Sequence, residues 1–125
     1  MNDERFAKEF GEVASLVEKH RRFLILGHVD PDGDCIGSML ALASYLRGKG
    51  KEVACFTPGD MAEIYLELPL MKLFIAEGEL APFDPDMVFA LDSPTVARTA
   101  DLVKRENGKP VVNIDHHPTN ERYGD

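Results

Sequence analysis

The sequence contains no tryptophan and only two cysteines, and none of its apolar runs is long. A membrane span needs about 18 consecutive apolar residues, so we expect neither a span nor a membrane partner. Cys35 and Cys55 stand apart from each other, which excludes a disulfide framework and a zinc knuckle. The first residues lack the basic start and apolar stretch of a secretory signal, so we expect a cytoplasmic protein.

Basic residues are also fewer than acidic residues. The sequence has 14 lysines and arginines against 22 aspartates and glutamates, which gives a formal net charge of -8. Electrostatic repulsion would keep a long polyanion away, so duplex DNA is not an expected partner. Divalent cations would offset the acidic charge locally and admit a small phosphorylated substrate. With 125 residues and 44% hydrophobic content, the chain is expected to form one domain with its own core.

Four short apolar runs without alternation predict the strands of a parallel sheet that is covered on both faces. These runs are residues 23–27, 53–56, 87–91 and 111–114. Helical spacing of apolar residues predicts helices over 4–19, 36–47 and 95–106. Proline and glycine interrupt residues 57–85, for which we predict no element. The pattern indicates a doubly wound α/β fold with helices on both faces, for which we expect the strand order 2-1-3-4.

Three groups of polar residues directly follow predicted strands. Residues 28–34 read His-Val-Asp-Pro-Asp-Gly-Asp, Asp92 follows the third strand, and residues 115–117 read Asp-His-His. Two of these groups hold three of the four histidines. Ligands of open parallel sheets bind outside the carboxyl ends of the strands, and the expected strand order brings these three loops together.

Imidazole and carboxylate groups without thiolates suit manganese, magnesium, iron, cobalt or zinc, and the many carboxylates favour manganese. Two such ions about 3.5 to 4 Å apart can bind a phosphoryl oxygen, stabilise the leaving oxygen and turn a bridging water into hydroxide. Asp92, alone at its strand end, is suited to bridge them. Gly33 allows a tight turn. Gly37 and Ser38 lie where the amides opening a helix would favour a phosphate.

Each group also has a simpler structural explanation. Asp-Pro-Asp-Gly is common turn chemistry, and Asp34 could cap a helix. Asp92 could be another cap because Ser93-Pro94 follows it, and the paired histidines could be solvated at a strand end. Cys35 is expected to be a small buried residue, although a thiol close to a metal would be sensitive to oxidation. The combination at three strand ends favours a functional site.

Taken together, the motifs resemble those of a known family. The sequences HxDPDGDxIGS at residues 28–38, LDS at 91–93 and DHHPxN at 115–120 are similar to the first three motifs of the DHH phosphoesterase superfamily. The glycine, aspartate and serine pattern of the first motif is most similar to the branch of nanoRNases and 3′-phosphoadenosine 5′-phosphate phosphatases. The likeness spans residues 23–125.

The resemblance implies a centre with two Mn²⁺ ions, for which Mg²⁺ or Co²⁺ could substitute. His28, Asp32 and Asp92 would bind the first ion. Asp34, Asp92 and His116 would bind the second. Asp92 would thus belong to both ions.

The resemblance also implies roles for residues around the metals. His117 would face the phosphate as an electrostatic or acid partner, and Asp115 would orient the neighbouring histidines. Arg98 would contact the phosphate or brace its loop.

The implied activity is hydrolysis of short RNA or DNA oligonucleotides, or removal of the 3′-phosphate of adenosine 3′,5′-bisphosphate. Family members continue with a fourth motif and a smaller C-terminal domain that grips the nucleotide. We therefore expect residues 1–125 to be the truncated N-terminal domain of a longer protein, inactive or weakly active alone. Two alternatives stay open: a cyclic or linear dinucleotide phosphodiesterase, and a non-catalytic nucleotide-binding regulatory module. The sequence does not indicate the oligomeric state.

Overall fold

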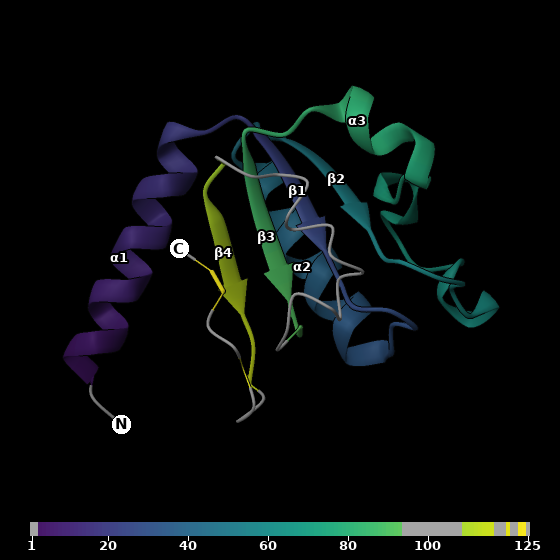
Figure 1. Cartoon of the computed structure of the whole chain (residues 1–125), viewed down its shortest axis with the longest axis horizontal. Coiled ribbons are helices and arrows are strands. Elements are labelled where there is room, and N and C mark those ends of the chain that lie inside the picture. Colours follow the sequence, from purple (N-terminus) through teal and green to yellow (C-terminus); the bar gives the residue numbers. More distant parts are fainter. Residues whose placement is uncertain (1–2, 94–108, 117–119, 121–122, 125) are drawn as a thin grey trace.

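A four-stranded parallel sheet lies at the centre of the molecule (Figure 1). The computed structural model describes residues 3–93, 109–116, 120 and 123–124. The strands are β1 (Arg22–Leu26), β2 (Glu52–Phe56), β3 (Met87–Leu91) and β4 (Val111–Ile114). Their order is β2-β1-β3-β4, and all neighbouring strands are parallel. The predicted α/β class, the four strands and the order 2-1-3-4 are confirmed.

The direction of winding reverses between β1 and β3. From β1 the chain crosses to β2 on one side, and it then returns to β3 and β4 on the other. Leu26 is the register partner of Ala90, and Leu91 is that of Ile114, so these strands end near the same level. Their following loops leave from one edge, called here the carboxyl edge of the sheet. Folds of this kind bind ligands at such an edge, near the reversal.

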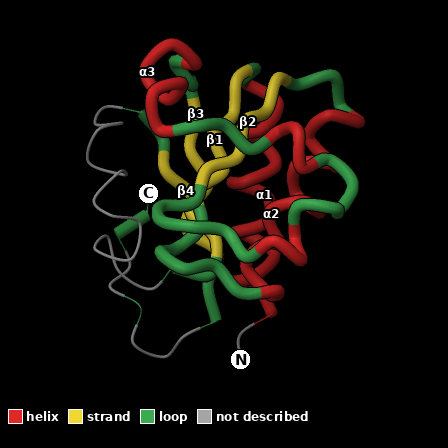
Figure 2. Tube along the Cα trace, turned by 90° about the vertical axis from the view of Figure 1, so that its right-hand side faces the viewer, coloured by secondary structure: helices red, strands yellow, loops and turns green. Residues whose placement is uncertain are grey.

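Two long helices cover one face of the sheet. The helix α1 spans Asp3–Lys19 and α2 spans Gly33–Gly48, and Figure 2 places both on the same side of the strands. The sequence predicted that α2 begins at residue 36, nearly one turn later than it does. It begins at Gly33 because the side chain of Asp32 caps it, accepting a hydrogen bond from the amide of Cys35 at 2.9 Å. No helix among the described residues is long and apolar enough to cross a membrane.

The core fills both faces of the sheet. Beneath α1 and α2, Phe23 and Phe89 stack with ring centroids 6.0 Å apart. The buried residues of this face are Val17, Phe23, Ile25, Cys35, Met39, Ala43, Leu46, Cys55, Met87, Phe89 and Leu91. The opposite face buries Leu24, Leu26, Ala54, Phe56, Leu80, Val88, Ala90 and Val111. Burial on both faces explains why the strand sequences are apolar without alternation.

The segment between β2 and β3 consists of short helical turns joined by irregular backbone. Three 3₁₀ turns are followed by the short helix α3 (Leu80–Phe83), whose Leu80 packs on the second face of the sheet. The amide of Ile75 donates to the carbonyl of Cys55 at 2.9 Å, which ties the segment to β2. Periodicity could not predict this segment because its turns are too short to repeat a pattern.

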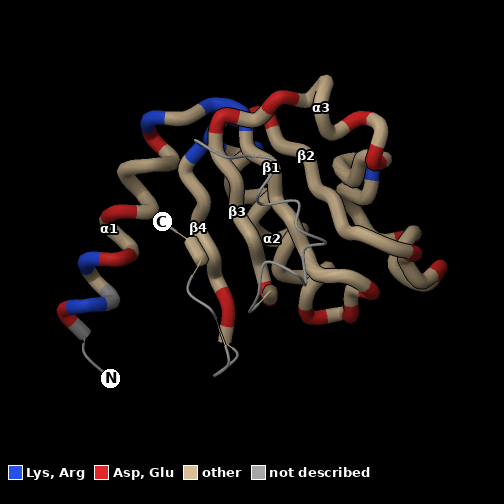
Figure 3. The backbone as a smooth tube through the Cα atoms, viewed as in Figure 1, with Lys and Arg blue, Asp and Glu red and all other residues tan. Residues whose placement is uncertain are grey.

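Acidic residues are prominent at the carboxyl edge of the sheet (Figure 3). Among the described residues, the loops 27–32, 92–93 and 115–116 contain aspartates and histidines but no lysine or arginine. The negative potential of this edge would attract cations.

Candidate metal centre

His28 lies just beyond β1 and is almost fully buried, with 4% of its surface exposed. Its Nδ1 lies 2.8 Å from the backbone oxygen of Val29. Because a carbonyl oxygen only accepts hydrogen bonds, Nδ1 donates to it, and Nε2 is the ring nitrogen that faces Asp92. Nε2 lies 3.3 Å from Oδ2 of Asp92. At this distance the two atoms can share either a proton or a cation.

Asp92 lies between two histidines at the end of β3, and only 7% of its surface is exposed. Its Oδ2 lies 3.3 Å from Nε2 of His28, and its Oδ1 lies 3.0 Å from Nε2 of His116. Two ligand atoms that bind one ion at about 2.1 Å are roughly 3.0 to 3.4 Å apart at octahedral or tetrahedral angles. Each oxygen of Asp92 is therefore spaced to share an ion with a different histidine.

The backbone at Asp92 has an unusual conformation that the neighbouring strand holds in place. Its φ is 52°, in the left-handed region that costs a non-glycine residue about 1 to 2 kcal/mol. The amide of Asp92 donates to the carbonyl of Ile114 at 2.9 Å, and the hydroxyl of Ser93 donates to the carbonyl of Leu91 at 2.8 Å. Such outliers are concentrated at functional sites, where the surrounding structure fixes them.

A second group of ligand atoms lies on the solvent side of Asp92. Nε2 of His116 is 3.6 Å from Oδ2 of Asp34, in addition to its contact with Asp92. The side chains of Asp34 and His116 are 65% and 73% exposed. Asp34 lies in the first turn of α2, where the helix dipole stabilises a carboxylate. The carboxylate–imidazole set of this exposed position suits a hard divalent ion.

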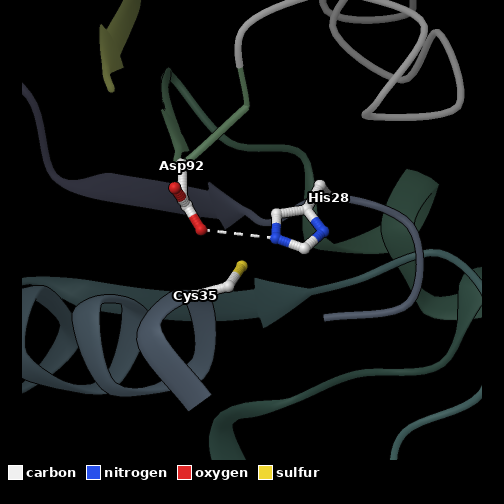
Figure 4. A group of neighbouring side chains, drawn as sticks. All are labelled: His28, Cys35 and Asp92. Atoms are coloured by element: carbon white, nitrogen blue, oxygen red, sulfur yellow. Dashed lines mark ion pairs between the residues drawn. The ribbon is translucent and has the colours of Figure 1, made fainter. Parts of the chain in front are cut away.

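The buried side of Asp92 holds a donor that the sequence did not reveal. His28, Cys35 and Asp92 are all buried, and one ligand atom from each lies within 4.8 Å of the others. Figure 4 shows the sulfur of Cys35 directed toward the gap between His28 and Asp92. Burial raises the pKa of the Cys35 thiol to about 11, with the negative charge of Asp92 adding to the effect and a hydrogen bond with the backbone of His28 opposing it.

Asp32, which we expected beside His28, lies farther from it than Asp92 does. Its Oδ1 lies 3.9 Å from Nε2 of His28, and the same oxygen accepts the capping hydrogen bond from Cys35. The side chain of Asp32 is 65% exposed. Asp32 therefore acts as a helix cap in the structure, and a role in metal binding stays a prediction.

Asn113 connects the loops that carry Asp92 and His116. Its Nδ2 lies 3.1 Å from the carbonyl oxygens of both Ala90 and Ser93, to which it donates. Asn120 donates from its own Nδ2 to Oδ1 of Asn113 at 2.6 Å and to Oδ2 of Asp115 at 2.9 Å. This network fixes the relative positions of the two strand ends. Its sequence signals are a polar residue inside an apolar strand and the asparagine that closes the DHHPxN motif.

Tyr123 adds to the same network, because its hydroxyl donates to the carbonyl of Ser93 at 2.7 Å.

Gly37 and Ser38 lie in the second turn of α2, where backbone amides are paired within the helix, so they do not offer the helix-opening amides we expected. The side chain of Ser38 is exposed. His117, Arg98 and the helix predicted over 95–106 lie outside the described residues, and their roles stay predictions.

The donor set fits two divalent ions, one on either side of Asp92. The buried position offers His28, Cys35 and Asp92, and the exposed position offers Asp34, Asp92 and His116. Of the residues expected to bind metal, the structure brings together His28, Asp34, Asp92 and His116, with Asp32 at the margin.

Comparisons with known proteins point to one family. The family model described as "DHH family, N-terminal domain" matches residues 22–124. A bifunctional oligoribonuclease and PAP phosphatase NrnA of Thermus thermophilus is 38% identical over 104 residues, which cover 80% of this chain and 29% of that protein. The protein of the same name from Mycoplasma pneumoniae is 27% identical over 111 residues, which cover 86% of this chain and 34% of that protein. The chain thus spans about a third of the length of these relatives.

The fold also matches a solved structure. An exopolyphosphatase-related protein from Bacteroides fragilis aligns with a TM-score of 0.80 and 24% sequence identity, over 90% of this chain and 35% of that chain. At this identity the likeness supports the fold alone.

Proposed function

Because the chain belongs to the DHH family, whose N-terminal domain model matches residues 22–124, we propose that it carries the metal centre of a phosphoesterase acting on short oligonucleotides and on adenosine 3′,5′-bisphosphate. Its relatives named oligoribonuclease and PAP phosphatase support this substrate class. We also propose that residues 1–125 form the N-terminal domain of a longer enzyme and contribute little turnover alone.

The position of Asp92 carries the proposal. Its two oxygens lie 3.3 and 3.0 Å from the Nε2 atoms of His28 and His116, on opposite sides of one carboxylate. A helix cap would need neither histidine, and a solvated strand end would not bury Asp92. The simpler explanation of the Asp92 motif as an isolated cap is therefore unsupported.

We propose two Mn²⁺ ions for this centre, with Mg²⁺ or Co²⁺ as substitutes. The acidic carboxyl edge supports a need for cations, because an anionic substrate would otherwise meet like charge. When bound, such a pair polarises the phosphoryl oxygen and makes hydroxide available near neutral pH.

The protein residues would position the reaction. His28 and Asp92 are buried, so they hold their orientation and keep water from one side of the centre. Asp34 and His116 are exposed, so a phosphate would approach from their side. His117, which follows His116 in the sequence, remains the proposed acid or electrostatic partner of that phosphate, with Arg98 as a further candidate.

The proposal is tested by incubating the complete protein with Mn²⁺ and a diribonucleotide, adenosine 3′,5′-bisphosphate or a cyclic dinucleotide in parallel assays. We expect release of mononucleotide from the first and of inorganic phosphate from the second. Hydrolysis of the cyclic substrate alone would favour the dinucleotide phosphodiesterase alternative. No turnover of any substrate, with metal occupancy confirmed, would overturn the enzymatic proposal in favour of a binding module. The cytoplasmic location remains a prediction from the sequence.

A further inference from the structure

We propose that Cys35 is a metal ligand at the buried position, so that this position accepts thiophilic ions while the exposed position does not. The inference rests on the metal centre proposed above. It adds a sulfur donor that none of the motifs indicated, and it makes the two positions chemically different.

The geometry of the buried position supports the assignment. The ligand atoms of His28, Cys35 and Asp92 lie within 4.8 Å of one another, and the relative exposed surface of Cys35 is 0%. In Figure 4 the sulfur of Cys35 points toward the facing atoms of His28 and Asp92. Asp32 does not belong to this group of ligand atoms, and its Oδ1 already accepts the amide of Cys35. The thiol is therefore the third donor that a buried ion would meet.

The surrounding residues hold the sulfur in this place. Sγ of Cys35 lies 3.9 Å from Sδ of Met39, a weak contact between two soft atoms. A Cβ atom at Gly27 would lie only 2.6 Å from Sγ, so glycine at this position leaves room for the sulfur under the end of β1. Close packing on two sides restricts the sulfur to the neighbourhood of His28.

The types of ligand atom predict which metal ions each position prefers. Nitrogen, sulfur and carboxylate oxygen together suit zinc, cobalt or cadmium, whereas carboxylates with imidazole suit manganese and magnesium. When Cys35 binds an ion, the S–H bond is replaced by a sulfur–metal bond and the proton passes to solvent. A protein given both kinds of ion would then hold a thiophilic ion beside His28 and a hard ion beside His116.

Cobalt spectroscopy tests the inference. We would titrate Co²⁺ into the wild-type chain, Cys35→Ser and the matched control Cys55→Ser, whose thiol is buried in β2 and belongs to neither group of candidate ligands. Wild type and Cys55→Ser should show visible Co²⁺ bands and a sulfur-to-cobalt charge-transfer band in the near ultraviolet. Cys35→Ser should keep the visible bands and lose the charge-transfer band. Its affinity for Zn²⁺ should fall at least about tenfold, with little change for Mn²⁺.

The outcomes separate this inference from the proposed function. Visible bands without a charge-transfer band in wild type would overturn the role of Cys35 and leave the metal centre intact. A charge-transfer band that persists in Cys35→Ser would do the same. The absence of any Co²⁺ spectrum would overturn the metal centre itself. If Cys35→Ser does not fold, the ¹¹³Cd chemical shift of the wild-type chain tests whether sulfur binds the ion. A shift typical of oxygen and nitrogen ligands alone would exclude Cys35 as a ligand.

Discussion

The two sides of Asp92 differ in nearly every physical property. On one side His28 and Cys35 are buried and packed against the end of the sheet, and on the other Asp34 and His116 are mostly exposed. The buried side is fixed by packing, whereas the side chains of the exposed side meet solvent. We infer that the buried position anchors the centre and that the exposed position meets the substrate. One carboxylate serves both because its two oxygens point in different directions.

The largest expected effect follows from removing the shared charge. Asp92→Asn should lower turnover of the complete protein at least about a thousandfold, because it weakens both metal positions at once. Asparagine tolerates the positive φ of 52°, so the backbone should be preserved. Turnover and bound metal would be measured beside Asp60→Asn, which removes the same charge from an exposed residue between β2 and β3. Equal activity of the two variants would contradict a bridging role for Asp92.

The two histidines should respond differently to the same substitution. His28→Ala should lower stability by about 1 to 3 kcal/mol without metal, because it leaves buried Asp92 without this partner. His116→Ala removes an exposed side chain and one contact of Asp92, so it should cost less, about 0.5 to 1.5 kcal/mol. Urea unfolding in the presence of a chelator measures both. Calorimetric titration with Mn²⁺ should show that each variant loses a different site, and identical binding curves would show that the positions are not distinct.

Gly27→Ala should damage the buried position selectively. The added Cβ would lie 2.6 Å from Sγ of Cys35, 2.7 Å from Sδ of Met39 and 2.8 Å from Cγ2 of Thr57. Overpacking of this kind typically costs about 1 to 3 kcal/mol, measurable by urea unfolding. Gly11→Ala is the matched control, since nothing lies within 4 Å of its Cβ and alanine favours the helix α1. A neutral Gly27→Ala would show that the sulfur is not confined.

The smallest effect separates capping from metal binding at Asp32. Asp32→Ala should destabilise the chain by about 1 kcal/mol through loss of the cap of α2, whereas Asp32→Asn should cost much less because asparagine also caps helices. If Asp32 binds metal as well, Asp32→Asn should still weaken Mn²⁺ binding. Thermal unfolding with chelator measures the stability of each variant, and titration with Mn²⁺ measures its metal affinity. Unchanged Mn²⁺ affinity in Asp32→Asn would restrict Asp32 to capping.

Much of the fold follows from local sequence patterns. The apolar runs predicted the strands, and the acidic groups after them predicted where the loops converge, because parallel strands end at a common edge. The place of Asp92 between the two histidine motifs followed from the same argument.

The remaining features depend on three-dimensional relations that no short pattern encodes. The helix α2 begins at Gly33, which places Cys35 in its first turn and close to His28. The bonds of Asn113 join strand ends far apart in sequence. Gly37 and Ser38 were assigned to the first turn because the capping role of Asp32 was not recognised.

Anomalous diffraction from crystals soaked in Mn²⁺ tests the central claim most directly. We expect two manganese peaks about 3.5 to 4 Å apart, one on the His28 side of Asp92 and one on the His116 side. Manganese peaks away from Asp92, or a single peak that touches only one of its oxygens at full occupancy, would contradict a shared carboxylate between two unequal positions.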